Sequence, residues 1–254
     1  MTWNVNSIRS RQEKVVDWMR RHSPDVLLMQ ETKCTDEVFG APEFTGVYEA
    51  MGYEVAHHGH DHWNGVAVVS RVGLADVRRG FPGVNRPPYD EARLISAMCA
   101  GIRVWSVYVP NGRELDNPHY LFKLVWLERL RSAIDLGVPT VLAGDLNVAP
   151  ADLDIYDPSR WRRRTHASPP ERAGITALTD LGLRDVTREH HPGPGVYTWW
   201  SYRPGQFEQQ RGLRLDLALC TAEVADRVHS VSIDTDERAS GHASDHAPLV
   251  IDLN

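Results

Sequence analysis

Seven polar side chains in this sequence are of the types that hold a metal ion and move protons. They are Asn4, Glu31, Asp145, Asn147, Asp216, Asp245 and His246. Carboxylate and amide oxygens are the ligands that Mg²⁺ and Mn²⁺ prefer, and a histidine beside them exchanges protons near neutral pH. Each residue alone has an ordinary structural interpretation, such as a turn at Asp145 and Asn147. Together they indicate a metal-assisted reaction.

Hydrolysis of a phosphate ester is the reaction that suits this set of groups. A divalent ion polarises the ester and offsets the charge on the departing oxygen, while an acidic side chain or an amide positions a water for in-line attack. A histidine held by a carboxylate stabilises the phosphate oxygens. The residue types therefore predict metal-assisted phosphoester hydrolysis and leave the substrate open.

Two predicted helix-strand pairs lead up to the candidate residues. Apolar side chains recur at helical spacing over residues 12–22, and residues 25–30 then have the pattern of a buried strand that ends at Glu31. Asn117 followed by proline suits the start of a second helix, and a strand over residues 140–143 leads to Asp145. The apolar face of this second helix is predicted to carry Tyr120, Leu124, Leu127, Leu130 and Ile134.

The remaining strand signals predict the fold class. They cover residues 66–69, 94–99, 104–109, 215–219, 228–233 and 248–253. Short turns between several of them favour antiparallel hairpins, so we expect two mixed β-sheets packed face to face with flanking helices, an α/β sandwich. Because strand ends share one rim in such a fold, the candidate residues should gather there. The absence of repeats and linkers predicts a single domain over residues 1–254.

The net charge of −6 argues against indiscriminate binding to nucleic acid. The charge is uneven, because basic side chains outnumber acidic ones between residues 155 and 214. The densest run is Arg160 to Arg164, which includes Trp161. This run has the composition of a solvated loop, but its place in the one basic third of the chain favours a guide for a phosphate backbone.

Other features exclude several classes of protein. The three cysteines are far apart and odd in number, which predicts reduced thiols in a cytoplasmic protein. Neither an export signal nor an apolar stretch long enough to span a membrane is visible, so no membrane partner is expected. The histidines between His57 and His62 are irregularly spaced, and we expect a solvated loop there in preference to a metal site.

Seven motifs in order resemble one known family. WNVNSIRSR, PDVLLMQETKC, SVYVPNG, AGDLNVAP, TWWSYR, GLRLDLAL and SDHAPL are similar to the motifs of the exonuclease III family of AP endonucleases, within the endonuclease/exonuclease/phosphatase superfamily. The likeness runs over essentially the whole chain. It implies a four-layer α/β sandwich.

The resemblance also implies a role for each candidate. Glu31 corresponds to the principal metal carboxylate, with Asn4 and Asp245 near the ion. Asp145 corresponds to the acid that activates the attacking water or protonates the leaving oxygen, and Asn147 to the amide that orients it. His246 would contact the scissile phosphate, with Asp216 holding its ring, and Tyr108 would lie on the phosphate side. The general base is left open between Asp145 and a Tyr108 phenolate.

The resemblance further implies a DNA-binding surface. Trp199 and Trp200 correspond to an aromatic wall that receives a flipped-out baseless sugar, although Trp200 is equally well explained as core. Leu213 would form the second apolar side of a small closed pocket. The other implied DNA contacts are Asn111, Arg113, Arg160, Arg162 and Arg163.

The expected function is therefore Mg²⁺- or Mn²⁺-dependent cleavage of double-stranded DNA on the 5′ side of abasic sites, by a monomer. The family likeness allows 3′-to-5′ exonuclease and 3′-phosphatase activities as well. Two alternatives stay open: a phosphodiesterase of the same superfamily for RNA ends or a small molecule, and a DNA-binding module without catalysis. The second would follow if the short strand before Asn4 left that side chain loose.

Overall fold

The computed structural model describes residues 1–83 and 91–254 and contains two six-stranded sheets. One sheet has the order β11 (Val228–Ile233), β12 (Leu249–Leu253), β1 (Thr2–Asn4), β2 (Val26–Gln30), β4 (Val66–Ser70) and β3 (Glu54–His58). The other has the order β5 (Ala75–Arg79), β6 (Leu94–Cys99), β7 (Ile102–Tyr108), β8 (Thr140–Asp145), β10 (Asp216–Cys220) and β9 (Arg184–Asp185). The pairs β1–β2 and β7–β8 are parallel. Both sheets are therefore mixed, as predicted.

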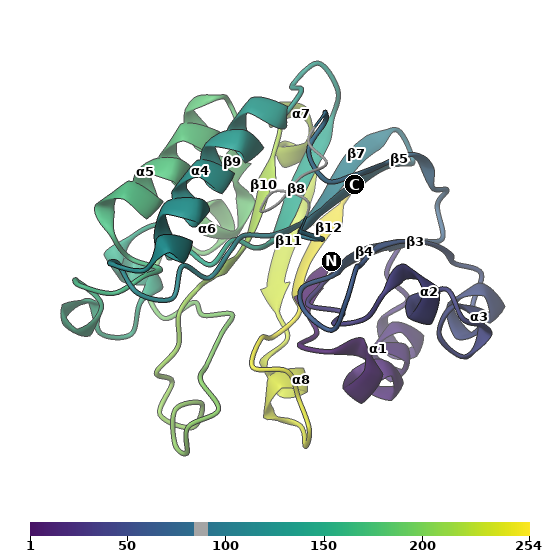
Figure 1. Ribbon diagram of the computed structural model, residues 1–254, viewed down its shortest axis with the longest axis horizontal. Coiled ribbons are helices and arrows are strands. Elements are labelled where there is room, and N and C mark those ends of the chain that lie inside the picture. The colour runs from purple at the N-terminus through teal and green to yellow at the C-terminus, as the bar shows by residue number, and fades with distance from the viewer. Residues whose placement is uncertain (84–90) are drawn as a thin grey trace.

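Helices cover the outer face of each sheet (Figure 1). On one side lie α1 (Ile8–His22), α2 (Asp36–Phe39) and α3 (Pro42–Ala50), and on the other lie α4 (Pro118–Ala133) and α5 (Pro169–Asp180). The shorter helices are α6 (Val186–His190), α7 (Ala222–Ala225) and α8 (Thr235–Ala239), with 3₁₀ turns at Asp152–Asp154 and Pro158–Arg160. None of the helices in the described parts of the chain has the length and hydrophobicity needed to span a lipid bilayer.

Successive side chains along a strand are buried alternately between the two sheets and between a sheet and its helices. Leu28 of β2 lies in the core between the two sheets, whereas its neighbours Leu27 and Met29 pack with α1. In β8, Val141 faces the core between the sheets and Leu142 packs under α4 and α5. Since successive strand residues point to opposite faces, each sheet is buried on both sides. The result is the four-layer α/β sandwich expected from the family resemblance.

The predicted helices are present, with one difference in α4. The side chain of Asn117 caps this helix by accepting a hydrogen bond from the His119 amide at 2.9 Å. Its buried face contains Lys123 and Trp126 beside Tyr120, Leu127 and Leu130, while Leu124 is only half-buried and Ile134 follows the last turn. The prediction of Leu124 on the core face was wrong because the buried stripe follows 3.6-residue spacing through Lys123, a residue that hydrophobicity alone assigns to the surface.

The expectation of a solvated loop from His57 to His62 is also wrong for its first two residues. His57 and His58 end β3 and are buried, at 6% and 7% exposure. His57 stacks on Phe39 and contacts Asp36 through Nδ1 at 2.8 Å. His60, Asp61 and His62 are exposed. A strand partner and an aromatic neighbour from distant segments bury the first half of this histidine run.

The strand registers bring the candidate residues to one rim. Tyr108 at the end of β7 pairs with Asp145 at the end of β8, and Asp145 pairs in turn with Asp216 at the start of β10. In the opposing sheet, Asn4 ends β1 and faces this edge across the interface between the sheets. The site is therefore formed where the two sheets meet.

Candidate active site

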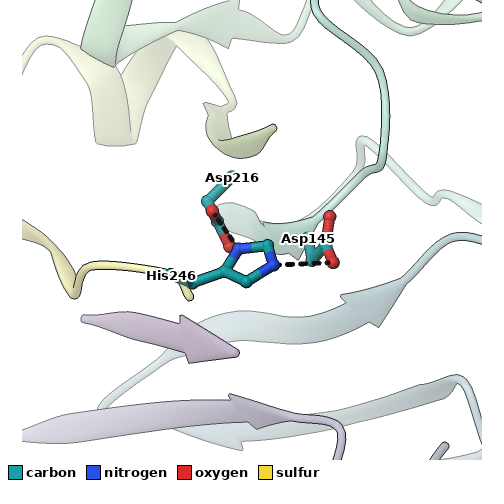
Figure 2. A group of neighbouring side chains, drawn as sticks. All are labelled: Asp145, Asp216 and His246. Carbon is teal, nitrogen blue, oxygen red and sulfur yellow. Dashed lines mark hydrogen bonds and ion pairs between the residues drawn. The ribbon is translucent and has the colours of Figure 1, made fainter. Parts of the chain in front are cut away.

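A buried histidine between two aspartates forms the centre of the site (Figure 2). His246 Nδ1 is 2.7 Å from Asp216 Oδ2, and His246 Nε2 is 3.6 Å from Asp145 Oδ2. Burial acts to lower the pKa of His246, but the negative charges of Asp216 and Asp145 prevail and raise it to about 10. The ring is therefore an imidazolium at neutral pH, and its Nε2 proton points to the side of Asp145.

Asp145 is held by amides from both sheets. Its Oδ1 accepts a hydrogen bond from the Asn147 backbone at 2.9 Å, and its Oδ2 accepts from Asn4 Nδ2 at 2.9 Å and from Asn147 Nδ2 at 3.2 Å. Burial raises its pKa to about 7, against the opposing effect of the His246 charge. Such a carboxyl group can take up or release a proton near neutral pH.

The short first strand does not leave Asn4 loose. Its side chain is fully buried, and Nδ2 also donates to Glu31 Oε1 at 2.9 Å. The Ser244 hydroxyl donates to the backbone carbonyl of Asn4 at 2.6 Å, which ties β1 to the loop before His246. A loose Asn4 side chain was the condition for the alternative of a DNA-binding module without catalysis, and this condition is not met.

Glu31 and Asp245 are connected through two residues that the sequence analysis missed. Lys33 Nζ lies 2.8 Å from Glu31 Oε2 and donates to Asn6 Oδ1 at 2.5 Å. Asn6 Nδ2 in turn donates to Asp245 Oδ1 at 3.0 Å. The Lys33 ammonium ion thus occupies a position on the Glu31 carboxylate that a bound cation could take.

The donor atoms of this half of the site fit a hard divalent ion. Asn4, Glu31 and Asp245 offer carboxylate and amide oxygens with no sulfur ligand, the set that Mg²⁺ and Mn²⁺ prefer. Asp145, Asp216 and His246 also lie close enough together to hold an ion. Because the His246 imidazolium already lies between the two aspartates, the oxygens around Glu31 are the better fit for a cation.

Tyr108 borders the site beside Glu31. Burial and the nearby Glu31 carboxylate raise its pKa well above the ordinary value, so it is a neutral phenol. The guanidinium of Arg93 lies over its ring, 4.7 Å from the centroid. Tyr108 is thus available as a hydrogen-bond donor and not as a phenolate.

The two predicted wall tryptophans have different environments. Trp199 is half-buried, and its Nε1 donates to Asp245 Oδ2 at 3.0 Å. Trp200 is 1% exposed and packs edge-on against Tyr197 and Phe207. Trp200 therefore belongs to the core, which corrects its assignment to the DNA-binding surface. Only Trp199 faces the site.

The prediction of a small closed apolar pocket between Trp199 and Leu213 is wrong. Leu213 is fully buried and packs in an apolar cluster behind Trp199. The cavity in front of Trp199 has a volume of about 480 Å³ and is lined by Tyr156, Arg160, Trp161, Arg164, Trp199, Ser201, Arg203, Gln206 and Arg211. A loop after Trp200 that includes Gln206 and Arg211 forms one wall. Because four arginines and three aromatic rings line the cavity, it is cationic and aromatic in place of purely apolar.

A second cavity extends the basic surface toward Asn111. It has a volume of about 690 Å³, and its lining includes Asn111, Arg113, Arg163 and His166 together with the acidic Glu114 and Asp116. Trp161 and Arg164 line both cavities. Arg162 is exposed on the same turn. The five predicted polar DNA contacts thus lie along or beside one basic band next to the catalytic rim.

Other functional side chains were missed although a signal existed for them. Thr198 Oγ1 accepts hydrogen bonds from the backbone amides of Leu215 and Asp216, both at 3.0 Å, and so fixes the start of β10. Asn6 and Thr198 both stand inside motifs that the sequence analysis quoted, two residues and one residue from a candidate. Lys123 stands at a core position of a helix, which is the pattern of a buried, paired lysine.

The comparisons with known proteins agree with this fold and site. The model of the endonuclease/exonuclease/phosphatase family matches residues 1–246, so the chain belongs to this family. Within it, the similarity is to exonuclease III enzymes: exodeoxyribonuclease III of Haemophilus influenzae is 32% identical, over 98% of this chain and 97% of that protein. The protein is accordingly a nuclease of the exonuclease III type.

Two solved structures share nearly the whole fold. The structure of an AP endonuclease from Archaeoglobus fulgidus is 37% identical with a TM-score of 0.93, covering 100% of this chain and 98% of that one. The structure of a 3′ phosphatase from Neisseria bound to a product DNA hairpin is 36% identical with a TM-score of 0.95, at the same coverage. At these identities the likeness extends beyond the fold.

Proposed function

We propose that this protein is a Mg²⁺-dependent DNA repair nuclease that hydrolyses the DNA backbone on the 5′ side of abasic sites, with Mn²⁺ as the alternative ion. The observation that carries the proposal is the buried array of Asp145, His246 and Asp216 beside the carboxylate of Glu31. The adjacent basic band supplies the phosphate contacts that such a substrate needs.

The reaction would be divided between the two halves of the site. Asn4, Glu31 and Asp245 would hold the divalent ion, which supplies charge stabilisation to the phosphate and the departing oxygen. The His246 imidazolium donates a hydrogen bond to a phosphate oxygen, with Asp216 fixing the orientation of the ring. Asn147 Nδ2 lies 3.2 Å from Asp145 Oδ2 and orients the attacking water beside that carboxylate.

Asp145 is our candidate for the general base. Its pKa of about 7 allows it to accept the proton of the attacking water near neutral pH. The raised pKa of Tyr108 argues against a phenolate at the same pH. Tyr108 then contributes a hydrogen bond on the phosphate side of the substrate.

A second activity has support of equal weight. A Neisseria 3′ phosphatase resembles this chain as closely as the Archaeoglobus AP endonuclease does. The open cavity in front of Trp199 does not by its size require the loss of a base. We therefore include removal of 3′-phosphates and 3′-terminal nucleotides in the proposal. The superfamily alternative, a phosphodiesterase for RNA ends or a small molecule, is not separated from DNA cleavage by a cavity lined by four arginines and three aromatic rings, which suits RNA phosphates equally. The similarity to DNA enzymes favours DNA.

One gel assay tests the proposal. The substrates are a duplex with one tetrahydrofuran abasic analogue, a nicked duplex with a 3′-phosphate, and an intact blunt duplex, each with Mg²⁺ and with EDTA. We expect Mg²⁺-dependent incision at the analogue and release of the 3′-phosphate, both lost in Asp145→Asn. Failure on all three DNA substrates, together with hydrolysis of an RNA end, would favour the alternative.

The assembly and location complete the proposal. We propose that the protein acts on double-stranded DNA as a monomer, which light scattering of the protein-DNA complex can test. The three cysteines are all buried and unpaired, in keeping with the expected cytoplasmic location, which fluorescence imaging of a tagged chain can test.

A further inference from the structure

A fully buried ion pair lies beneath the two loops that carry Asn111 and Asn147. Lys123 of α4 and Glu171 of α5 have no exposed side-chain surface, and Lys123 Nζ is 2.5 Å from Glu171 Oε1. The two helices run side by side over the sheet that contains β8, the strand that ends at Asp145 (Figure 1). Neither residue has a role in the reaction described above.

The ammonium group of Lys123 binds both loops through their backbones. It donates to the carbonyl oxygen of Asn147 at 2.7 Å and to that of Asn111 at 3.2 Å. These loops follow β8 and β7, the strands that end in Asp145 and Tyr108. One charged group therefore connects the loop of the water-orienting amide with the loop of a predicted DNA contact.

Glu171 completes the connection from the other side. Its two oxygens accept hydrogen bonds from the Thr165 hydroxyl at 2.7 Å, the His166 amide at 2.9 Å, and the Ser168 amide and hydroxyl at 3.0 and 2.6 Å. Burial acts to raise its pKa, but the Lys123 charge and these bonds hold the pKa at about 2. Glu171 is thus a carboxylate at every pH at which the enzyme would work.

Hydrogen bonds to its carbonyl oxygen fix the Asn147 backbone. Asn147 has a φ of +51°, in the left-handed region that is uncommon for non-glycine residues, although asparagine adopts it several times more often than most. Its carbonyl also contacts His166 Nδ1 at 2.6 Å, while its side-chain amide donates to the Val109 carbonyl at 2.9 Å. The left-handed conformation turns the amide toward Asp145, and the hydrogen bonds to the carbonyl hold that conformation.

The Asn111 loop packs directly on the same pair. Gly112, at a φ of +88°, leaves no room for a Cβ atom, which would lie 2.6 Å from Thr165 Oγ1 and 3.1 Å from Lys123 Cδ. Thr165 Oγ1 also lies 2.8 Å from the Asn111 carbonyl oxygen, so its single proton is shared between that oxygen and Glu171 Oε1. Both loops are therefore held against one polar centre.

We propose that Lys123 and Glu171 are positioning residues, which hold the Asn147 amide for the chemical step and the Asn111 loop for DNA binding. The proposal rests on the function proposed above for these two asparagines. A buried ion pair is weak evidence for a stabilising role, because apolar side chains of similar size usually replace one without loss of stability. Here an apolar replacement would leave two loop carbonyls without their donor.

Four variants separate positioning from stability. Lys123→Met and Glu171→Gln each remove one charge, and the double variant Lys123→Met, Glu171→Leu replaces the pair by apolar side chains. The matched control is Arg103→Met, which removes a buried cation paired with Asp76 at the other end of β7. We measure Tm, kcat and KM with the abasic duplex or the 3′-phosphate substrate, whichever the wild-type protein cleaves.

Positioning predicts that kcat stays at least tenfold low and KM severalfold high in the double variant when both are measured well below its own Tm. That Tm should fall, because the loop carbonyls and the hydrogen-bond donors to Glu171 lose their partners. Glu171→Gln, which keeps the size and shape of the side chain, should lower kcat severalfold, and Arg103→Met should leave kcat and KM within twofold. Wild-type kcat and KM in both the double variant and Glu171→Gln would overturn the proposal.

A second readout separates this proposal from the proposed function. In ¹⁵N NMR spectra the side-chain amide signals of Asn147 and Asn111 should shift in the double variant and in Glu171→Gln, and not in Arg103→Met. This holds even if the wild-type protein cleaves none of the DNA substrates, in which case the proposed function fails and the positioning role stands. Unshifted amide signals in both variants would refute the positioning role.

Discussion

His246 and Asp216 form a buried hydrogen bond of 2.7 Å between Nδ1 and Oδ2, although Asp216 begins β10 in one sheet and His246 lies in the loop before β12 of the other sheet. The Asp216 carboxylate carries a second oxygen, Oδ1, that has no hydrogen-bond partner among the described residues. The negative charge of Asp216 is therefore balanced mainly by the imidazolium. This dependence makes the charge state of His246 the most direct property to test.

Replacing Asp216 by Asn should lower the pKa of His246 from about 10 toward the ordinary value of 6.5. The folded-state pKa exceeds the unfolded one, so the stability that this pair contributes is fully present below pH 6.5 and is lost as the pH rises through about 10. NMR titration of the metal-free protein measures the pKa. Urea unfolding should show a wide gap between wild type and variant at pH 6 and a narrow gap at pH 10. An equal gap at both pH values would contradict the prediction.

The bond between Trp199 and Asp245 connects the proposed DNA wall with the proposed metal site. Trp199→Phe keeps an aromatic ring but removes the donor to Asp245 Oδ2. Loss of such an outer hydrogen bond typically weakens metal binding by about 10- to 100-fold. We therefore expect the Mg²⁺ concentration for half-maximal activity to rise at least tenfold, with kcat at saturating Mg²⁺ less affected. Trp161→Phe, on the same cavity, is the control and should leave the Mg²⁺ requirement unchanged.

Asn4 should set the pH at which Asp145 becomes a base. The hydrogen bond from Asn4 lowers the pKa of Asp145, in opposition to burial, which raises it. In Asn4→Ala the pKa should therefore rise, and the rising limb of the kcat profile should move to higher pH, with kcat at pH 7 down at least tenfold. Thr2→Val removes another buried polar group from β1 and should leave the profile in place. A profile that keeps its rising limb in Asn4→Ala would argue against Asp145 as the base.

The exposed arginines should contribute to DNA affinity through salt-dependent contacts. Arg160 and Arg163 line the two cavities of the basic band. If each contacts one phosphate, its change to Ala lowers the slope of log Kd against log salt by about 0.9. Fluorescence anisotropy in the Asp145→Asn background measures binding without cleavage. Arg131→Ala, an exposed arginine paired with Glu128 on α4, should not change the slope, and an unchanged slope in Arg160→Ala would remove that residue from the interface.

Much of the fold and of the catalytic set could be predicted because the signals are local. Period-two and period-3.6 hydrophobicity marks each strand and helix, and polar residues such as Asp145 and Glu31 follow directly where a strand ends. The order of the motifs then identified the family, because all seven short segments occur in this one sequence and in the order typical of that family. These features depend on neighbouring residues, so no tertiary contact is needed to find them.

The remaining features of the site depended on contacts between distant segments. Sequence alone favoured Trp199 over Trp200 as the wall residue and left Trp200 undecided between wall and core. The structure decides it, because Trp199 contacts Asp245 and Trp200 packs against Tyr197 and Phe207. The arginine-lined cavity replaced the expected apolar pocket because Arg203 and Arg211, from the loop after Trp200, line the cavity together with Arg160 and Arg164.

The sequence by itself thus determined which residue types stand at the strand ends and, through them, the class of chemistry. Only the tertiary structure decided which of these residues meet. Lys123 shows the physical reason: hydropathy places a lysine on the surface, but an opposite charge and two backbone carbonyls from three separate segments satisfy it in the core. Burial of a charged group depends on partners that only the assembled sheets and helices bring within hydrogen-bond distance.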